Sequence, residues 1–239
     1  MKINEHQAIL TPRILLVPYC THHVPTYHSW MQDEEIQKAT ASSPLTLSEE
    51  HAMQQSWRLD HDKLTFIICL APSPSLSASS PAIKSEIHDT PTKMIGDVNL
   101  FLYEDEEEEN EVDGMQGKKA VVGEIEIMIA AQSSRRQGFA QEAVRAFLSY
   151  ISSNISSILE EYRLGSDERS ERYIKYLRVK IGQENGASVG LFGKLGFETV
   201  GGVNYFGEVE MRMGWGECGG FEGGGRGRSC WVWSLIVDW

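Results

Sequence analysis

The chain has 239 residues, of which 41% are hydrophobic, and this is enough to bury one substantial core. Its formal net charge of −12 at pH 7 argues against a nucleic-acid partner, because phosphate binding needs a surplus of Lys and Arg on one face. The four cysteines form no C-x-x-C pair and no stretch approaches the ~20 apolar residues of a membrane span, so we expect no metal site and no membrane contact.

The first third of the chain predicts a strand, a group of short helices and a second strand. Residues 13–18 are rich in β-formers and end in a proline, which is typical of a short strand. Residues 21–38 carry apolar side chains at near-helical spacing and predict one or two short helices. Ser48 is the expected N-cap of a further helix that leads to Trp57. The continuous apolar run over residues 64–70 predicts a buried strand.

Two insertions interrupt the middle of the chain. Residues 72–91 are rich in Ser and Pro and have no apolar period, so we expect a flexible insertion rather than a domain boundary. A strand is predicted over residues 94–103. The acidic, glycine-containing stretch 104–119 is typical of a solvated loop.

The strand predicted over residues 120–130 alternates strictly between two kinds of side chain. Because successive residues of a strand point to opposite faces, one face carries Ile125, Ile127 and Ile129. The other face carries Glu124, Glu126 and Met128.

Four more elements complete the predicted domain, which spans residues 1–213. They are a helix over 141–159, a strand over 176–182 after a charged insertion at 165–172, a helix over 187–195 and a strand over 206–213. The order of elements predicts an α/β domain with a mixed sheet and helices on its faces. Residues 214–239 are first glycine-rich and then apolar, and we expect a disordered tail or a gene-model artefact there.

The junction between the strand 120–130 and the next helix predicts an anion site. A strand–turn–helix junction presents free backbone N–H groups at the positive end of the helix dipole. Gly138 lets the backbone approach a pyrophosphate closely, and Ala140 keeps the first helical turn small. Arg135 and Arg136 can add positive charge.

Two motifs carry a resemblance to a known family. Arg135-x-x-Gly138-x-Ala140 resembles the acetyl-CoA pyrophosphate loop of the GNAT acetyltransferases, and the block Asn185 to Phe197 resembles the family's N-x-x-S…[FY]-x-K-x-G-F signature. The resemblance covers residues 13–213. It is close to the N-acetyltransferase 9-like branch, near the ribosomal-protein N-terminal acetyltransferases, in segments such as Gly96-Asp-Val-Asn-Leu-Phe101 and Gly123-Glu-Ile-Glu-Ile-Met-Ile-Ala130.

The resemblance implies the fold and the binding of acetyl-CoA as cosubstrate. The fold would be a GNAT fold, a mixed and mostly antiparallel sheet with a splayed V-shaped cleft and helices on both faces. The strand end would pair with pantetheine, and the turn would hold the pyrophosphate. Lys194 could lie near the phosphates or be a surface lysine. The residues expected to contact acetyl-CoA are Met128, Ile129, Ala130, Arg135, Arg136, Gln137, Gly138, Phe139, Ala140, Asn185, Ser188, Phe192 and Lys194.

The chemistry requires a group that takes a proton from the amine and a group that can give one to the thiolate. Glu124 matches the glutamate of the E-I-G-Y-type strand of the N-terminal acetyltransferases and is the first candidate base, with Glu126 beside it. Both could instead bind the acceptor or face solvent. Many family members have a tyrosine where this chain has Phe192, so Ser188 is the candidate donor, with a helix N-cap or a bond to CoA as its alternative role.

These inferences predict an active N-acetyltransferase that acts on a protein or peptide amine. The alternative is a catalytically weak or inactive acetyl-CoA-binding module for protein interaction, which the missing tyrosine favours. A dinucleotide-binding oxidoreductase is disfavoured, because the turn lacks two glycines of that fingerprint. We expect a cytoplasmic protein that could also be nuclear, and the sequence assigns no oligomeric state.

Overall fold

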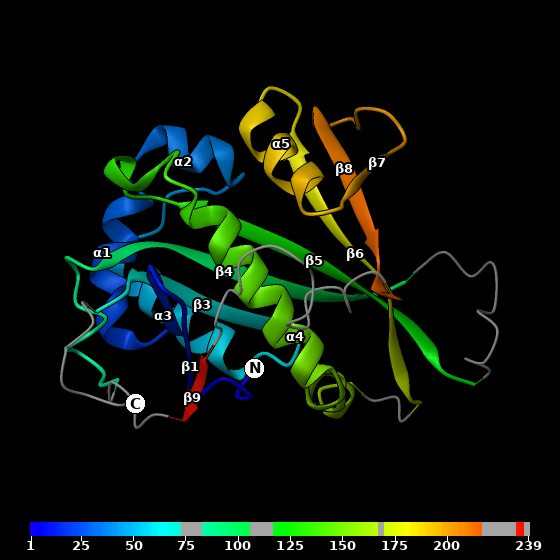
Figure 1. Cartoon of the computed structure of the whole chain (residues 1–239), viewed down its shortest axis with the longest axis horizontal. Coiled ribbons are helices and arrows are strands. Elements are labelled where there is room, and N and C mark those ends of the chain that lie inside the picture. The colour runs from blue at the N-terminus through cyan, green and yellow to red at the C-terminus, as the bar shows by residue number, and fades with distance from the viewer. Residues whose placement is uncertain (73–82, 106–116, 167–169, 217–232, 237–239) are drawn as a thin grey trace.

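The computed structural model describes residues 1–72, 83–105, 117–166, 170–216 and 233–236 (Figure 1). Within them, one nine-stranded sheet has the order β7-β8-β6-β5-β4-β3-β2-β1-β9. The strands are β1 (Gln7–Leu10), β2 (Ile14–Pro18), β3 (Lys63–Leu70), β4 (Met94–Glu104), β5 (Lys119–Ile129), β6 (Arg172–Gly182), β7 (Glu198–Val200), β8 (Glu208–Gly214) and β9 (Trp233–Ile236). The helices are η1 (Thr21–His23), α1 (Val24–Trp30), α2 (Glu34–Ala39), α3 (Leu47–Leu59), η2 (Gln132–Ser134), α4 (Phe139–Leu164) and α5 (Gly186–Lys194).

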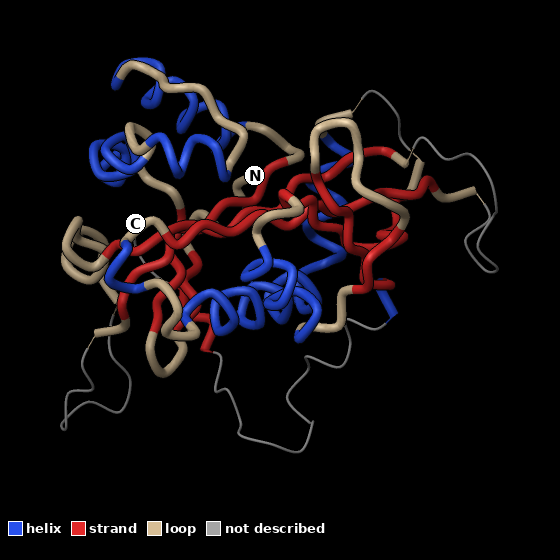
Figure 2. The backbone as a smooth tube through the Cα atoms, turned by 90° about the horizontal axis from the view of Figure 1, so that it is seen from above, coloured by secondary structure: helices blue, strands red, loops and turns tan. Residues whose placement is uncertain are grey.

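Helices cover both faces of the sheet, and each face buries its own core (Figure 2). On one face the long helix α4 packs against the inner strands, and the fully buried side chains there include Phe66, Leu100, Val144, Phe147 and Ile151. On the other face α1 packs on α3, and the buried side chains there include Tyr19, Val24, Tyr27 and Ile67. This two-sided arrangement explains why the central strands are apolar along almost their whole length.

The sheet divides at the only parallel pair among the described strands. Strand β5 pairs with β6 from Lys119↔Arg172 to Glu124↔Arg178 and no further. Beyond this point β5 continues to Ile129 on the side of β4, while β6 continues to Gly182 on the side of β8. The two halves therefore diverge, as Figure 1 shows for β5 and β6. The predicted mixed, mostly antiparallel sheet with a V-shaped opening is confirmed.

The N-cap of helix α3 lies two residues before the predicted one. The N-cap is Thr46, whose Oγ1 accepts from the N–H of Glu49 at 3.3 Å, while a carboxylate oxygen of Glu49 accepts from the N–H of Thr46 at 2.8 Å. This reciprocal pair satisfies two N–H groups at once, which Ser48 could not do from inside the first turn. The expectation of Ser48 as the cap is therefore wrong.

Other boundaries also differ from those predicted. Helix α4 runs from Phe139 to Leu164, longer than the predicted 141–159, and strands β1 and β7 were not predicted. Strand β8 begins at Glu208 rather than 206, because Asn204 Oδ1 accepts from the N–H groups of both Phe206 and Glu208 at 2.9 Å and closes a turn there.

Parts of the expected insertions and tail are packed. Ile83 and Asp89, inside the stretch 72–91, are 5% and 0% exposed. Arg172, at the end of the stretch 165–172, is buried as the first residue of β6. Within the stretch 214–239, residues 233–236 form β9, which pairs antiparallel with β1. The remainder of the acidic loop and of the tail lies outside the described residues. No described helix is long and apolar enough to cross a lipid bilayer.

Candidate functional site

The turn between β5 and α4 leaves the first N–H groups of α4 available to a ligand. Gly138 is the N-cap of α4 and has φ +83°, a left-handed conformation that suits glycine, and Arg136 has φ +61°. No side chain among the described residues caps α4 at this end. The first-turn amides and the positive end of the helix dipole therefore have the arrangement that the predicted anion site requires.

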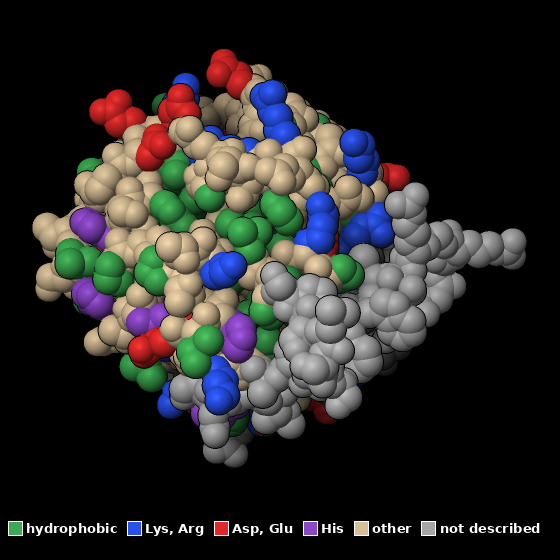
Figure 3. Space-filling view, turned by 60° about the vertical axis from the view of Figure 1, so that its left-hand side comes forward, with side chains coloured by type: hydrophobic (Ala, Val, Ile, Leu, Met, Phe, Trp, Pro, Cys, Tyr) green, Lys and Arg blue, Asp and Glu red, His purple; other side chains and the backbone are tan. Residues whose placement is uncertain are grey.

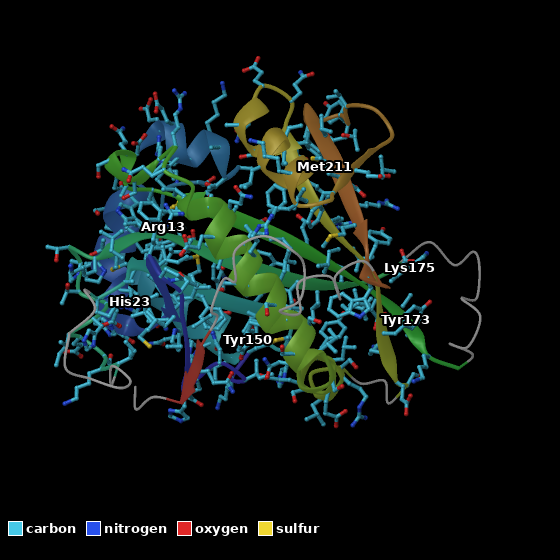
Figure 4. The ribbon with its side chains drawn as sticks, in the orientation of Figure 1. Arg13, His23, Tyr150, Tyr173, Lys175 and Met211 are labelled. Atoms are coloured by element: carbon cyan, nitrogen blue, oxygen red, sulfur yellow. The ribbon has the colours of Figure 1, made fainter. Side chains whose placement is uncertain are left out.

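Arg13 holds this turn from the start of β2, and it was not predicted. Its Nη1 donates to the carbonyl oxygen of Gln137 at 2.8 Å, and its Nε donates to the carboxylate of Glu142 at 2.6 Å (Figure 4). Its guanidinium carbon also lies 5.0 Å from the ring centre of Phe139. Arg13 lies more than a hundred residues from its partners in sequence, so local patterns carry no signal of this contact.

The two arginines of the motif have different environments. Arg135 donates from Nε to the carbonyl of Ile129 at 2.9 Å and from Nη2 to the carbonyl of Ala130 at 3.3 Å. Its guanidinium therefore braces the end of β5. Arg136 is exposed on the turn, as is Gln137, whose side chain donates to the carbonyl of Ser133.

The end of β5 presents one backbone edge without a neighbouring strand. Ile129 pairs with Gly96 on the β4 side, whereas pairing on the β6 side has ended at Glu124. Gly96 makes this close approach possible, because a Cβ atom there would lie 1.9 Å from the carbonyl oxygen of Met128. Met128 and Ile129 are partly buried beside the opening, and Ala130 is buried behind it.

The second motif builds the start of α5 on the other half of the sheet. Asn185 is its N-cap and accepts from the N–H of Ser188 at 3.1 Å, so the alternative role of Ser188 as the cap is wrong. Ser188 is half-buried in the first turn. Phe192 is 3% exposed and packs edge-to-face on Phe197, with ring centres 5.1 Å apart. Lys194 is exposed at the end of the helix.

The two candidate bases on β5 differ in their charge partners. The carboxylate of Glu124 lies 2.7 Å from Nε of Arg178 and 3.3 Å from Nζ of Lys180, and the residue is 7% exposed. Glu124 is therefore an ion-paired group located where β5 and β6 part. Arg178 and Lys180 lie on the strand predicted over residues 176–182, but the sequence did not show that they pair with Glu124.

Glu126 has the properties of a general base. Its side chain is exposed to solvent, yet it stands between the diverging halves of the sheet with protein on several sides. Desolvation by these surroundings, followed by the negative charges of Glu124 and Asp97, raises the pKa of Glu126 to about 7. A carboxyl that solvent reaches and that titrates near neutral pH can take a proton from an amine and pass it on.

The histidines near the start of α1 serve the packing of the helical layer. Nε2 of His22 and Nε2 of His23 lie 2.8 Å and 2.9 Å from the same carboxylate oxygen of Asp89. Nδ1 of the fully buried His23 accepts from the N–H of Cys20 at 3.0 Å. Cys20, His22 and His23 are close enough to hold an ion, but both nitrogens of His23 already have protein partners. Histidine side chains also reach the surface on this side of the molecule (Figure 3).

The comparison with family models agrees with the divided sheet and the turn. The model of the acetyltransferase (GNAT) domain matches residues 13–198, which run from Arg13, the residue that supports the turn before α4, to the first residue of β7. The chain belongs to the GNAT acetyltransferases, as its motifs predicted, and it is an N-acetyltransferase.

Sequence relatives narrow the class to one branch. The chain is 38% identical over 226 residues to an N-acetyltransferase 9-like protein of Schizosaccharomyces pombe, with 89% of this chain and 98% of that protein covered. It is 38% identical over 214 residues to the human alpha/beta-tubulin-N-acetyltransferase 9, with 89% of this chain and 86% of that protein covered. The predicted N-acetyltransferase 9-like branch is confirmed.

Solved structures agree with the fold. The spermidine N-acetyltransferase of Vibrio cholerae, solved in complex with CoA and spermine, aligns with a TM-score of 0.52 at 16% identity. The alignment covers 88% of this chain and 95% of that one. At this identity the likeness concerns the fold alone.

Proposed function

We propose that this protein transfers the acetyl group of acetyl-CoA directly to an amine of a protein or peptide acceptor. The observation that carries the proposal is the carboxyl of Glu126, which is open to solvent and has a pKa of about 7. It stands beside the strand edge that ends at the anion-binding turn. A base, an extended binding edge and a phosphate site within one opening are what an acetyl-CoA-dependent transfer to an amine requires.

The described residues suit acetyl-CoA in three places. The N–H groups of residues 137–140 would hold the pyrophosphate, with Arg136 as the exposed cation of the turn. The open backbone edge of residues 128–130 would pair with the pantetheine arm as an added strand does. The start of α5, with Asn185 and Ser188, would contact the arm from the other half of the sheet.

The reaction then follows from the position of Glu126. The neutral amine nitrogen attacks the acetyl carbonyl carbon, so that an N–C bond forms, and Glu126 takes the proton that the nitrogen loses. The C–S bond breaks and the CoA thiolate leaves, taking a proton from Ser188 or from water. Glu124 is not given this role in the scheme, because its carboxylate is already ion-paired with Arg178 and Lys180.

A protein acceptor is supported by the names of the relatives. The human, mouse and fruit-fly relatives are called alpha/beta-tubulin-N-acetyltransferase 9. Tubulin and peptides from its chain ends are therefore the first acceptors to test, alongside spermidine as a small-molecule amine.

The test combines binding and turnover in one preparation. We expect acetyl-CoA to bind in isothermal titration and CoA to be released in the presence of tubulin or its peptides. Glu126→Gln should lower turnover by about 10²-fold or more while acetyl-CoA still binds, because the base is lost but the anion site is intact. Glu198→Gln, an exposed carboxylate on β7, is the control and should keep full turnover.

Each other result has a definite meaning. Binding with no release from any amine would reject the catalytic proposal and favour the acetyl-CoA-binding interaction module. Turnover with spermidine but not with peptides would reject the protein acceptor. Full turnover in Glu126→Gln would reject Glu126 as the base.

A further inference from the structure

A buried carboxyl lies diagonally next to Glu126, on the same face of the sheet and on the neighbouring strand β4. In the β4–β5 pair Asn99 stands opposite Glu126, and Asp97 is two residues from Asn99. Side chains two residues apart on a strand share a face, so Asp97 and Glu126 are diagonal neighbours, typically about 7–8 Å apart at Cα. Asp97 is 2% exposed, whereas Glu126 is open to solvent. The carboxyl of Glu126 is therefore open to solvent, while the carboxyl of Asp97 beside it is buried.

Asp97 has fewer partners than a buried carboxylate normally has. Its Oδ2 accepts from Nδ2 of Asn99 at 2.9 Å, and the hydroxyl of Tyr27 lies 3.5 Å from the same oxygen. Its Oδ1 is buried without a hydrogen-bond partner, and no cation among the described residues pairs with it. Such a group costs the fold free energy, so its presence suggests a role other than packing.

The charged and titratable groups around the two carboxyls come from six elements and the residue after β2. Around Asp97 they are Tyr19 after β2, Tyr27 of α1, Glu50 of α3 and Glu126 of β5. Around Glu126 they are Asp97 and Tyr103 of β4, Glu124 of β5, Lys180 of β6, Glu208 of β8 and Tyr27 of α1. Lys180 is the one cation of this set, and it already pairs with Glu124. The charge of Asp97 is therefore left largely uncompensated where it faces Glu126.

We propose that Asp97 is a positioning residue that acts through Glu126, so that the two carboxyls take up the amine proton as one unit. This inference rests on the proposed role of Glu126. The proton leaves the acceptor nitrogen for a carboxylate oxygen of Glu126, and the nearby charge of Asp97 holds it there until water removes it. Asp97 does not touch the acceptor, because it is sealed under α1.

The titration of the two groups agrees with this geometry. Burial raises the pKa of Asp97 to about 6 in spite of its bonds to Asn99 and Tyr27, and Asp97 is the second of the three carboxylates that raise the pKa of Glu126, after Glu124 and before Glu208. The charge of Asp97 therefore favours the protonated form of Glu126.

The test is Asp97→Asn in the full chain, with turnover of the peptide acceptor followed against pH. Removing the charge lowers the pKa of Glu126, so the acid limb of kcat/KM should move to lower pH by about half a unit to one unit. The plateau kcat should fall by about 3- to 10-fold, because a weaker base accepts the proton less readily. The KM for acetyl-CoA should not change.

Asp89→Asn is the matched control. Asp89 is also fully buried and also has an Oδ1 without a partner, but its charge faces His22 and His23 rather than Glu126. This variant should keep the acid limb of the wild type. An equal shift of the limb in Asp89→Asn, or no shift in Asp97→Asn, would overturn the proposal.

Tyr27→Phe supplies a second variant that keeps the carboxyl. It removes a donor from Asp97, which then binds its proton at higher pH and loses charge near neutral pH. The acid limb should again move to lower pH, and adding Tyr27→Phe to Asp97→Asn should move it no further. A full additional shift in the double variant would show that Tyr27 acts independently of Asp97.

A measurement without turnover separates this inference from the proposed function. The ¹³C carboxyl signal of Glu126, identified by its loss in Glu126→Gln, should titrate at lower pH in Asp97→Asn than in the wild type. If no acceptor is acetylated, this shift alone still tests the coupling of the two carboxyls. An unchanged titration would reject the inference even if the protein is an active enzyme.

Discussion

At the scale of single residues, the site depends on small differences between neighbours. Glu124 and Glu126 share one face of one strand, but among the described residues only Glu124 forms ion pairs, with Arg178 and Lys180 of β6. The sequence predicted that both glutamates lie on the polar face beside the opening. The resemblance ranked Glu124 first as the base. It could not show the ion pairs of Glu124, because Arg178 and Lys180 lie over fifty residues away and the strand register decides which glutamate they reach.

The first prediction concerns the pH dependence of turnover. Glu126 must be ionised to accept a proton and its pKa is about 7, so kcat/KM should rise with pH through about 7 and then level off. Glu124→Gln removes one of the charges that raise this pKa and should move the acid limb to lower pH. A pH–rate profile measures both. A wild-type limb near the ordinary glutamate pKa would contradict the assignment of Glu126.

The second prediction concerns the close approach of β4 and β5. Gly96→Ala places a Cβ against the backbone of Met128, which cannot move aside as a flexible side chain can, and should destabilise the fold by about 3 kcal/mol or more. Gly190→Ala is the control. No atom lies within 4 Å of the added Cβ there, and alanine favours a helix, so stability should stay equal or rise by up to about 1 kcal/mol. Urea unfolding measures the free energy of unfolding of both variants. An equal loss of stability in Gly96→Ala and Gly190→Ala would contradict the packing argument.

At the scale of elements, the strongest sequence signals gave the right structure. The alternation over residues 120–130 predicted strand β5 correctly, and the motif predicted the turn before α4, because both depend on local backbone chemistry. Strands β1 and β7 were missed because they have four and three residues, too few for a period to show. Arg13 was missed because its contacts are purely tertiary.

The third prediction concerns the clamp on the turn. Arg13→Gln removes the bonds to Gln137 and Glu142 and should weaken acetyl-CoA binding by about 5- to 20-fold, because the turn loses its support. Arg145→Ala removes the same charge from an exposed position of α4 and should leave binding unchanged. Isothermal titration calorimetry compares the affinity of the two variants for acetyl-CoA. Equal losses would mean that net charge, and not the shape of the turn, governs binding.

At the scale of the whole molecule, the order of strands separates the site from the chain ends. Strands β5 and β6 border the site, whereas β1 and β9 lie at the far edge with β4, β3 and β2 between. The family motifs predicted the divided sheet correctly. The apolar periodicity alone could not predict it. Periodicity indicates which residues form strands, but not which strands are neighbours in the sheet.

The fourth prediction follows from this separation. Deleting residues 217–239 removes β9 from the edge of β1 and should leave kcat and the affinity for acetyl-CoA at the wild-type values. The change in melting temperature then measures what β9 contributes to the fold. Lost turnover in a variant that still melts cooperatively would contradict the placement of the site.

The point where β5 and β6 part also affects how the protein meets other chains. Unpaired strand edges normally attract further strands and promote aggregation when they lie on the outside of a sheet. Here the edges of β5 and β6 beyond Glu124 lie inside the sheet, where the two strands diverge, and not at its outer border. We expect edges in this position to accept a single extended chain, which pairs through its own backbone groups, rather than a second folded sheet.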